Sequence, residues 1–272
     1  MTGIPADRTT SPPSVLARWA DLRAFTSARV ALGRAGNGVP TAAHLAFQAD
    51  HAQARDAVHA ALDVPRIQAD LTAAGLANLS VHSAAPDRRT FLLRPDLGRR
   101  LRGSDHAILP KAPGAMLFVI CDGLSATAVQ RHAVPLLARV IPALTETGDV
   151  AAVVLAEQGR VALGDEIGEL MGVEAVALLI GERPGLSSPD SLGVYLTWQP
   201  RIGRTDAERN CISNIRGEGL PIAAAADKLL WLIRAMRRMR QTGIGLKDDQ
   251  PALRTSLREL TDGSVNDGLG QA

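Results

Sequence analysis

Apolar residues recur with helical spacing in the first quarter of the chain. Val15, Trp19 and Leu22 follow i, i+4, i+7 spacing, which gives a helix one apolar face. Glycine-rich breaks separate this segment from two further helical patterns. We therefore expect a small helical N-terminal domain over residues 14–76, after a flexible tail rich in Thr, Ser and Pro over residues 1–13. The expected helices span residues 14–25, 41–62 and 64–74.

From residue 77 the pattern changes to short apolar runs that alternate with helical segments. The middle runs (LFVIC, VAAVVLA and AVALLIG) are continuously apolar, which is typical of strands buried on both faces. Alternation of strands and helices predicts right-handed crossovers and an α/β fold, a parallel sheet with flanking helices. The expected strands span residues 79–82, 116–121, 150–156, 175–180 and 194–198. The expected helices span residues 90–101, 125–146, 161–171 and 221–240.

Composition and charge narrow the class of protein. Hydrophobic residues make up 46% of the 272 residues and charged residues 21%, which is ordinary for a globular protein. The net charge is +2 with basic and acidic residues interspersed, so nothing indicates a nucleic-acid partner. No apolar run reaches the roughly 18 residues of a membrane-spanning helix, and no signal peptide is visible at the start. We expect a cytoplasmic protein without a membrane partner.

Candidate chemistry gathers at the ends of the expected strands. In open parallel sheets, ligands bind outside the carboxyl ends of the strands. Four segments of this chain follow apolar runs and carry Gly, Ser or charged residues, and the third is too long for a simple crossover. Simpler interpretations stay open for two of these residues. Glu182 could be a solvated carboxylate instead of a ligand contact, and Cys211 a small buried apolar residue. The four segments are residues 121–125, 157–161, 181–190 and 204–214.

Several familiar sites are absent from the sequence. There is no G-x-G-x-x-G, no P-loop, no G-x-S-x-G and no H-E-x-x-H. Cys121 and Cys211 lie far apart without a C-x-x-C, so we expect neither a disulfide framework nor a zinc site. The six histidines are scattered, and none belongs to a D-x-H-x-x-G motif. The sequence therefore predicts no catalytic residues and no metal ligands of its own.

The sequence resembles the light chain of ethanolamine ammonia-lyase over about residues 26–248. The long segment after the fourth expected strand is the most specific part of the match. The motifs that carry the resemblance are GRAGNG (33–38), HAQARDAVH (51–59), EQGRVA (157–162), GERPGLSSPDSLG (181–193) and TDAERNCISNIR (205–216).

The resemblance implies a fold, a cofactor and a partner. It implies a Rossmann-like cobalamin-binding domain over residues 77–247. Residues 248–272 carry no resemblance, and we expect them to form a C-terminal tail. The family's light chain pairs with a heavy chain, a TIM barrel that holds the substrate, in a higher hetero-oligomer with adenosylcobalamin between the two chains. The assembled lyase deaminates ethanolamine to acetaldehyde and ammonia by a radical mechanism in which the cofactor supplies the radical. The cofactor contacts of the family fall on Val161, Glu182 and Cys211 here.

Two other functions stay open on the residues alone. A free-standing nucleotide-dependent enzyme would use the same sheet edge, although the phosphate-binding motifs are missing. A nucleic-acid adaptor would use the arginine-rich end of the last helix, although a solvated face explains those arginines as well. Packing into a bacterial microcompartment is a further possibility that the resemblance raises and the sequence leaves open.

Overall fold

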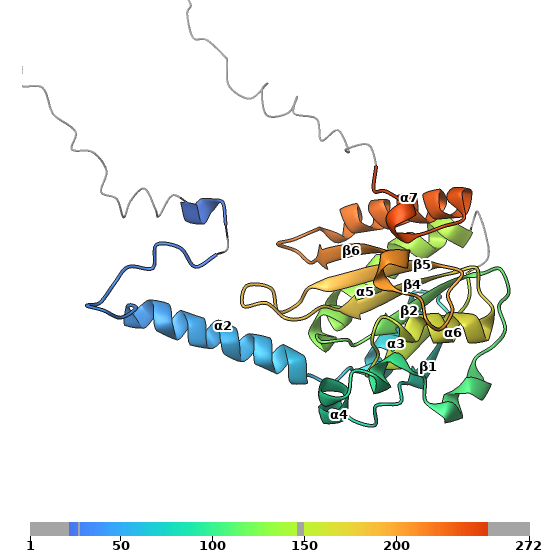
Figure 1. The fold of residues 1–272 in the computed structure, drawn as a ribbon, viewed down its shortest axis with the longest axis horizontal. Coiled ribbons are helices and arrows are strands. Elements are labelled where there is room, and N and C mark those ends of the chain that lie inside the picture. The colour runs from blue at the N-terminus through green and yellow to red at the C-terminus, as the bar shows by residue number, and fades with distance from the viewer. Residues whose placement is uncertain (1–21, 27, 146–149, 250–272) are drawn as a thin grey trace, which may run out of the picture.

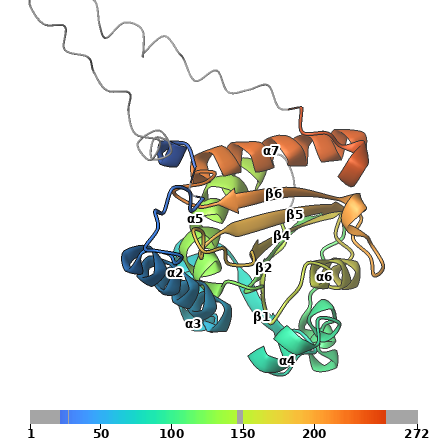
Figure 2. The same cartoon turned by 60° about the vertical axis from the view of Figure 1, so that its left-hand side comes forward.

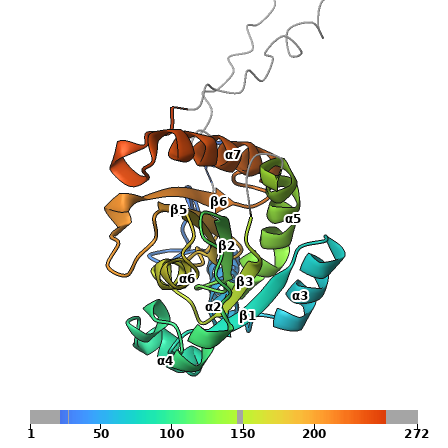
Figure 3. The same cartoon turned by 90° about the vertical axis from the view of Figure 1, so that its right-hand side faces the viewer.

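The computed structural model describes residues 22–26, 28–145 and 150–249. Six strands form one mixed sheet, with helices on both faces (Figures 1 and 3). The expected tail over residues 1–13, most of the expected helix over 14–25 and all but two residues of the tail over 248–272 lie outside the described residues. The strands are β1 (Asn78–His82), β2 (Met116–Cys121), β3 (Val153–Glu157), β4 (Ala175–Gly181), β5 (Leu192–Trp198) and β6 (Arg209–Ile215).

Helices alternate with the first four strands, as the hydrophobic pattern predicts. The expected helix over residues 90–101 is shorter, because Pro95 stops α4 at Leu93. The helices are α2 (Thr41–His59), α3 (Val64–Ala73), α4 (Arg88–Leu93), α5 (Ala126–Thr145), α6 (Leu163–Met171) and α7 (Ile222–Met239). Short 3-10 turns are η1 (Leu22–Ala24), η2 (Leu97–Arg99), η3 (Gly103–Ile108), η4 (Asp206–Glu208) and η5 (Gly243–Gly245).

The strand order is β1-β3-β2-β4-β5-β6, and the prediction of a parallel sheet is right for only part of it. Strands β1, β3, β2 and β4 are parallel, whereas β5 is antiparallel to β4 and β6 is antiparallel to β5. The connection from β4 to β5 contains no helix, so it returns as a long hairpin that pairs Gly181 with Leu192. The segment 204–214, expected as a strand-end loop, contains most of β6 instead.

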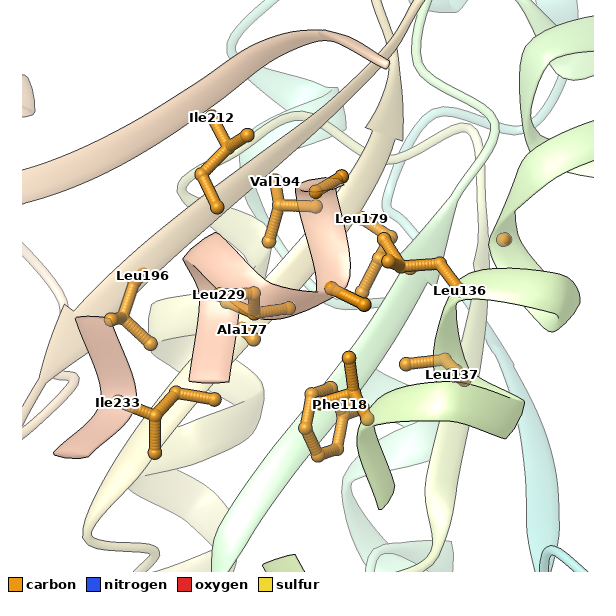
Figure 4. Packing of buried hydrophobic residues seen from close by; sticks show 14 of the residues in the cluster. Phe118, Leu136, Leu137, Ala177, Leu179, Val194, Leu196, Ile212, Leu229 and Ile233 are labelled. Atoms are coloured by element: carbon orange, nitrogen blue, oxygen red, sulfur yellow. The ribbon is translucent and has the colours of Figure 1, made fainter. Parts of the chain in front are cut away.

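Two hydrophobic layers enclose the sheet. Helices α3, α5 and α7 cover one face, where Phe118 packs with Leu136 and Leu137 of α5 (Figure 4). Helix α6 and the segment after α4 cover the other face, where Leu163 and Ile167 pack against the opposite side of β2 and β4. Aliphatic side chains supply most of both layers, as the low aromatic content predicts.

The two N-terminal helices differ in how they meet the sheet. Helix α3 gives Ile67 and Leu71 to the same core as α5, so it belongs to the body of the molecule. Helix α2 projects away from the body and buries only Ala57 of its side chains (Figures 1 and 2). Its last turn is tied down at the carbonyl of Val58, which accepts a hydrogen bond from Nε of Arg88 at 2.6 Å.

Candidate functional site

The sheet has a switch point between β2 and β3. The chain leaves β2 into α5 on one face and leaves β3 into α6 on the opposite face (Figure 3). Two loops, residues 122–125 and 158–162, therefore diverge at the carboxyl ends of neighbouring strands. Such a divergence opens a crevice at the sheet edge, which is where ligands bind in open α/β sheets.

Three glycines let the strand ends approach closely at this crevice. A Cβ on Gly181 would lie 2.1 Å from the carbonyl oxygen of Ser125, and one on Gly123 would lie 2.3 Å from the carbonyl oxygen of Gly181. Gly123 also has a φ of +54°, which favours glycine. A Cβ on Gly159 would lie 2.5 Å from Sγ of Cys121. These positions require glycine on steric grounds, and they leave bare backbone at the ends of β2, β3 and β4.

A buried ion pair holds the two diverging loops together. Nη1 of Arg88 donates to Oδ2 of Asp122 at 3.3 Å and to the carbonyl oxygen of Gly123 at 2.8 Å. The same nitrogen donates to Oε1 of Gln158 at 3.3 Å, and the amide of Gly159 donates to Oδ1 of Asp122 at 3.1 Å. Burial raises the pKa of Asp122 to about 6, although Arg88 opposes the rise. One arginine from α4 thus fixes the loops after β2 and β3.

Two hollows flank this network. The first has a volume of about 440 Å³, and the second about 380 Å³. Arg160 and Val161 line both hollows, so the start of α6 forms the ridge between them. The remaining lining residues of the first are Gly123, Leu124, Ile180, Gly181, Glu182, Arg183 and Tyr195. Those of the second are Arg99, Ala162, Arg204, Thr205, Asp206 and Arg209.

Glu182 stands at the rim of the first hollow with its carboxylate already oriented by the protein. Ser191 Oγ donates to Oε2 and Ser213 Oγ donates to Oε1, both at 2.5 Å. The amide of Asn214 donates to Oε2 at 3.2 Å. The carboxylate therefore joins the ends of β4, β5 and β6, and the interpretation of Glu182 as a merely solvated loop residue is wrong. Oε2 thus accepts two hydrogen bonds, whereas Oε1 accepts one and keeps lone-pair capacity for a further donor.

Cys211 lies in the middle of β6 and not in a strand-end loop. It pairs across the sheet with Tyr195, which lines the first hollow. Its side chain is exposed, so the alternative of a small buried apolar residue is wrong. Burial raises the pKa of Tyr195, and the neighbouring Cys211 raises it further, so this phenol stays protonated near neutral pH.

The structure thus places two of the three predicted site residues at the first hollow. Val161 and Glu182 line the first hollow, and Cys211 reaches it only through its partner Tyr195. Arg88, Arg160 and Tyr195 are not among the predicted site residues. Arg160 does lie in the candidate segment 157–161, but the roles of all three depend on residues distant along the chain.

The described residues show neither a metal centre nor a membrane span. Within them, no three His, Cys, Asp or Glu side chains gather closely enough to hold a metal ion. No helix among them has the length and apolar character to cross a bilayer.

Comparison with known proteins identifies the family. The model of the family "Ethanolamine ammonia-lyase light chain (EutC)" matches residues 16–247. The "Ethanolamine ammonia-lyase small subunit" of Azotobacter vinelandii is 54% identical over 243 residues, which cover 87% of this chain and 90% of that protein. The proteins of the same name from Bradyrhizobium diazoefficiens and Pseudomonas fluorescens are 56% identical over 234 residues and 49% identical over 259. These alignments cover 84% and 93% of this chain, and 90% and 94% of the relatives. The resemblance found in the sequence motifs is confirmed: the chain belongs to the ethanolamine ammonia-lyase light-chain family and is a subunit of a lyase complex.

Proposed function

We propose that this chain binds one side of adenosylcobalamin at its interface with the catalytic heavy chain of ethanolamine ammonia-lyase. The complex deaminates ethanolamine to acetaldehyde and ammonia, and the cofactor supplies the radical chemistry when it is bound. In this proposal Val161, Glu182 and Cys211 are the contacts, and the heavy chain, a TIM barrel, holds the substrate. This chain contributes binding and orientation.

The observation that carries the proposal is the hollow at the sheet switch point. A corrin is a large apolar ring edged with amides, and the hollow offers a matching mixture of groups. Val161 is an apolar contact, Glu182 is an oriented acceptor for amide N–H groups, and the bare backbone around Gly181 allows close approach. A volume of about 440 Å³ holds only part of such a cofactor, so a partner chain has to cover the rest.

The arrangement of the described residues also favours a subunit over a free-standing enzyme. Both carboxylate oxygens of Glu182 are occupied by structural hydrogen bonds, and Asp122 is buried in its ion pair with Arg88. Neither group is free to serve as an acid–base catalyst in the hollow. The residues therefore suit cofactor binding better than catalysis.

We also propose a Rossmann-like fold, a helical N-terminal domain and a cytoplasmic location for this chain. The switch point between β2 and β3 supports a Rossmann-like classification of residues 77–247, with two antiparallel strands added at one edge. Residues 14–76 would form a helical N-terminal domain that shares the core of the sheet through α3. We place the complex in the cytoplasm as a higher hetero-oligomer, and packing into a bacterial microcompartment stays an open alternative.

Equilibrium binding tests the proposal. Adenosylcobalamin is titrated into the heavy chain alone, this chain alone and the co-expressed complex. The complex should bind the cofactor and release acetaldehyde from ethanolamine, whereas this chain alone should bind weakly and release none. Equal affinity of the heavy chain alone and the complex would contradict the proposal, since this chain would then contribute nothing to the site.

A further inference from the structure

Three arginines at the proposed cofactor site have no carboxylate partner among the described residues. Arg99, Arg160 and Arg183 lie more than 4.0 Å from any acidic oxygen within residues 22–26, 28–145 and 150–249, since none of them forms an ion pair there. Their neighbours in the second hollow differ, because Arg204 is paired with Glu208 and Arg209 with Asp165. Unbalanced positive charge is thus concentrated around the ridge between the two hollows.

Arg160 is held rigidly at the centre of this group. Its amide donates to the carbonyl oxygen of Gly98 at 2.8 Å, and its Nη2 donates to the carbonyl oxygen of Phe91 at 3.1 Å. The guanidinium carbon lies 4.3 Å from the ring centroid of Phe91, a cation–π contact. Only glycine at position 98 allows this packing, because a Cβ there would lie 2.8 Å from Cγ of Arg160.

The other two nitrogens of the Arg160 guanidinium have no hydrogen-bond partner in the part of the chain that the structure describes. Nε is buried and makes no hydrogen bond, and Nη1 makes none with the part of the chain that the structure describes. Burial and the positive charges of Arg88, Arg99 and Arg183 lower the pKa of this arginine. Nε and Nη1 lie on different edges of the guanidinium, so a single anion cannot accept from both. Nε is enclosed by protein, whereas Nη1 can donate to an anion in a charge-assisted contact.

The proposed cofactor carries one group of the required chemistry. The corrin edge bears neutral amides, and the adenosyl group is also neutral, whereas the nucleotide loop contains a single phosphodiester anion. From the unpartnered Nη1 of Arg160 and its place beside Val161, we infer that Arg160 binds the phosphodiester of the cobalamin nucleotide loop. Arg99 on one side and Arg183 on the other supply additional positive charge. This inference rests on the proposed function.

Two corrinoids that differ only in a phosphate isolate the contact. Adenosylcobinamide phosphate and adenosylcobinamide are titrated into the complex of this chain with the heavy chain, and binding is followed by the absorbance of the corrin. The wild-type complex should prefer the phosphate-bearing probe by about tenfold, the effect of one charge-assisted contact. Arg160→Gln should reduce this preference to about one, while the affinity for adenosylcobinamide changes little.

Arg234→Gln is the matched control. Arg234 is an exposed arginine of α7 without an ion pair, so its replacement removes the same charge elsewhere and should keep the tenfold preference. Circular dichroism melts of both variants report whether the fold is retained. Equal affinity of the wild-type complex for the two probes, or an unchanged preference in the Arg160→Gln variant, overturns the inference. Failure of the complex to bind adenosylcobalamin itself overturns the proposed function instead.

Discussion

Replacing Asp122 by Asn should change how the stability of this chain depends on pH. Asp122 is 1% exposed and faces Arg88 at 3.3 Å. Burial raises its pKa from the ordinary 3.8 to about 6, even though Arg88 and the amide of Gly159 stabilise the charged form. The folded chain therefore binds the proton of this carboxyl more tightly than the unfolded chain does.

The sign and size of the effect follow from linkage. The folded pKa is raised, so the stability that Asp122 contributes is complete below about pH 4 and is lost as the pH rises through about 6. Between about pH 4.5 and pH 7.5 the loss is about 2 kcal/mol, at about 1.4 kcal/mol per pKa unit. Asn has no proton to lose in this range, so the Asp122→Asn variant lacks this contribution to the pH profile.

Urea titrations of the full chain at several pH values measure the difference. The free energy of unfolding of the variant minus that of the wild type should increase by about 2 kcal/mol from about pH 4.5 to about pH 7.5. The ion pair with Arg88 exists only where Asp122 is ionised, so its loss is already contained in the pKa of about 6, and effects of the substitution that do not depend on ionisation shift the whole curve without tilting it. Asp227→Asn removes an exposed carboxylate of α7 that has no ion pair, and its difference should stay flat. A flat difference for Asp122→Asn as well would refute the raised pKa, and a decreasing one would mean that attraction to Arg88 outweighs burial.

Three further predictions concern the site. Glu182→Ala should raise the dissociation constant of the complex for adenosylcobalamin about tenfold, measured by calorimetry, and an unchanged constant would remove Glu182 from the site. It should also lower the stability of the chain in urea titrations by about 1–2 kcal/mol, because Ser191 and Ser213 lose their acceptor. Gly181→Ala should cost about 3 kcal/mol or more, since its Cβ would strike the backbone of Ser125, whereas Gly103→Ala, which meets nothing within 4 Å, should be nearly neutral in the same assay. Cobalamin should bind with its own benzimidazole on the cobalt, because no described histidine lines either hollow; spin resonance of the reduced complex should show nitrogen coupling from the benzimidazole, and coupling that follows labelled protein histidine would contradict this.

The hydrophobic pattern alone predicted the alternation of strands and helices and the edge at which the site lies. Continuous apolar runs such as LFVIC need both faces covered, and the structure covers them with α5 and α6. Glu182 directly follows such a run and Val161 lies in the short segment after another, so their position near the strand ends could be predicted from the sequence. The steric need for Gly181 could not, because it depends on the backbone of Ser125, which lies 56 residues earlier in the chain.

Strand β6 was missed for a physical reason. Its sequence, RNCISNI, buries only Arg209, Ile212 and Ile215, and polar residues fill the remaining positions. An edge strand with one solvent-exposed face has an amino-acid composition similar to that of a loop. Its pairing with β5 follows from the hairpin after β4, and that pairing moves Cys211 from the expected loop to a position opposite Tyr195. The hydrogen-bond network around Arg88 could not be predicted from the sequence either, since it joins Arg88 to Asp122 and Gln158, which lie 34 and 70 positions away.

A cryo-electron microscopy map of the complex of this chain with the heavy chain, prepared with adenosylcobalamin, tests where the cofactor binds. We expect corrin density between the two chains, in contact with Val161 and Glu182 at the hollow between the ends of β2, β3 and β4. Corrin density enclosed by the heavy chain alone, with this hollow facing solvent or protein, would contradict this expectation.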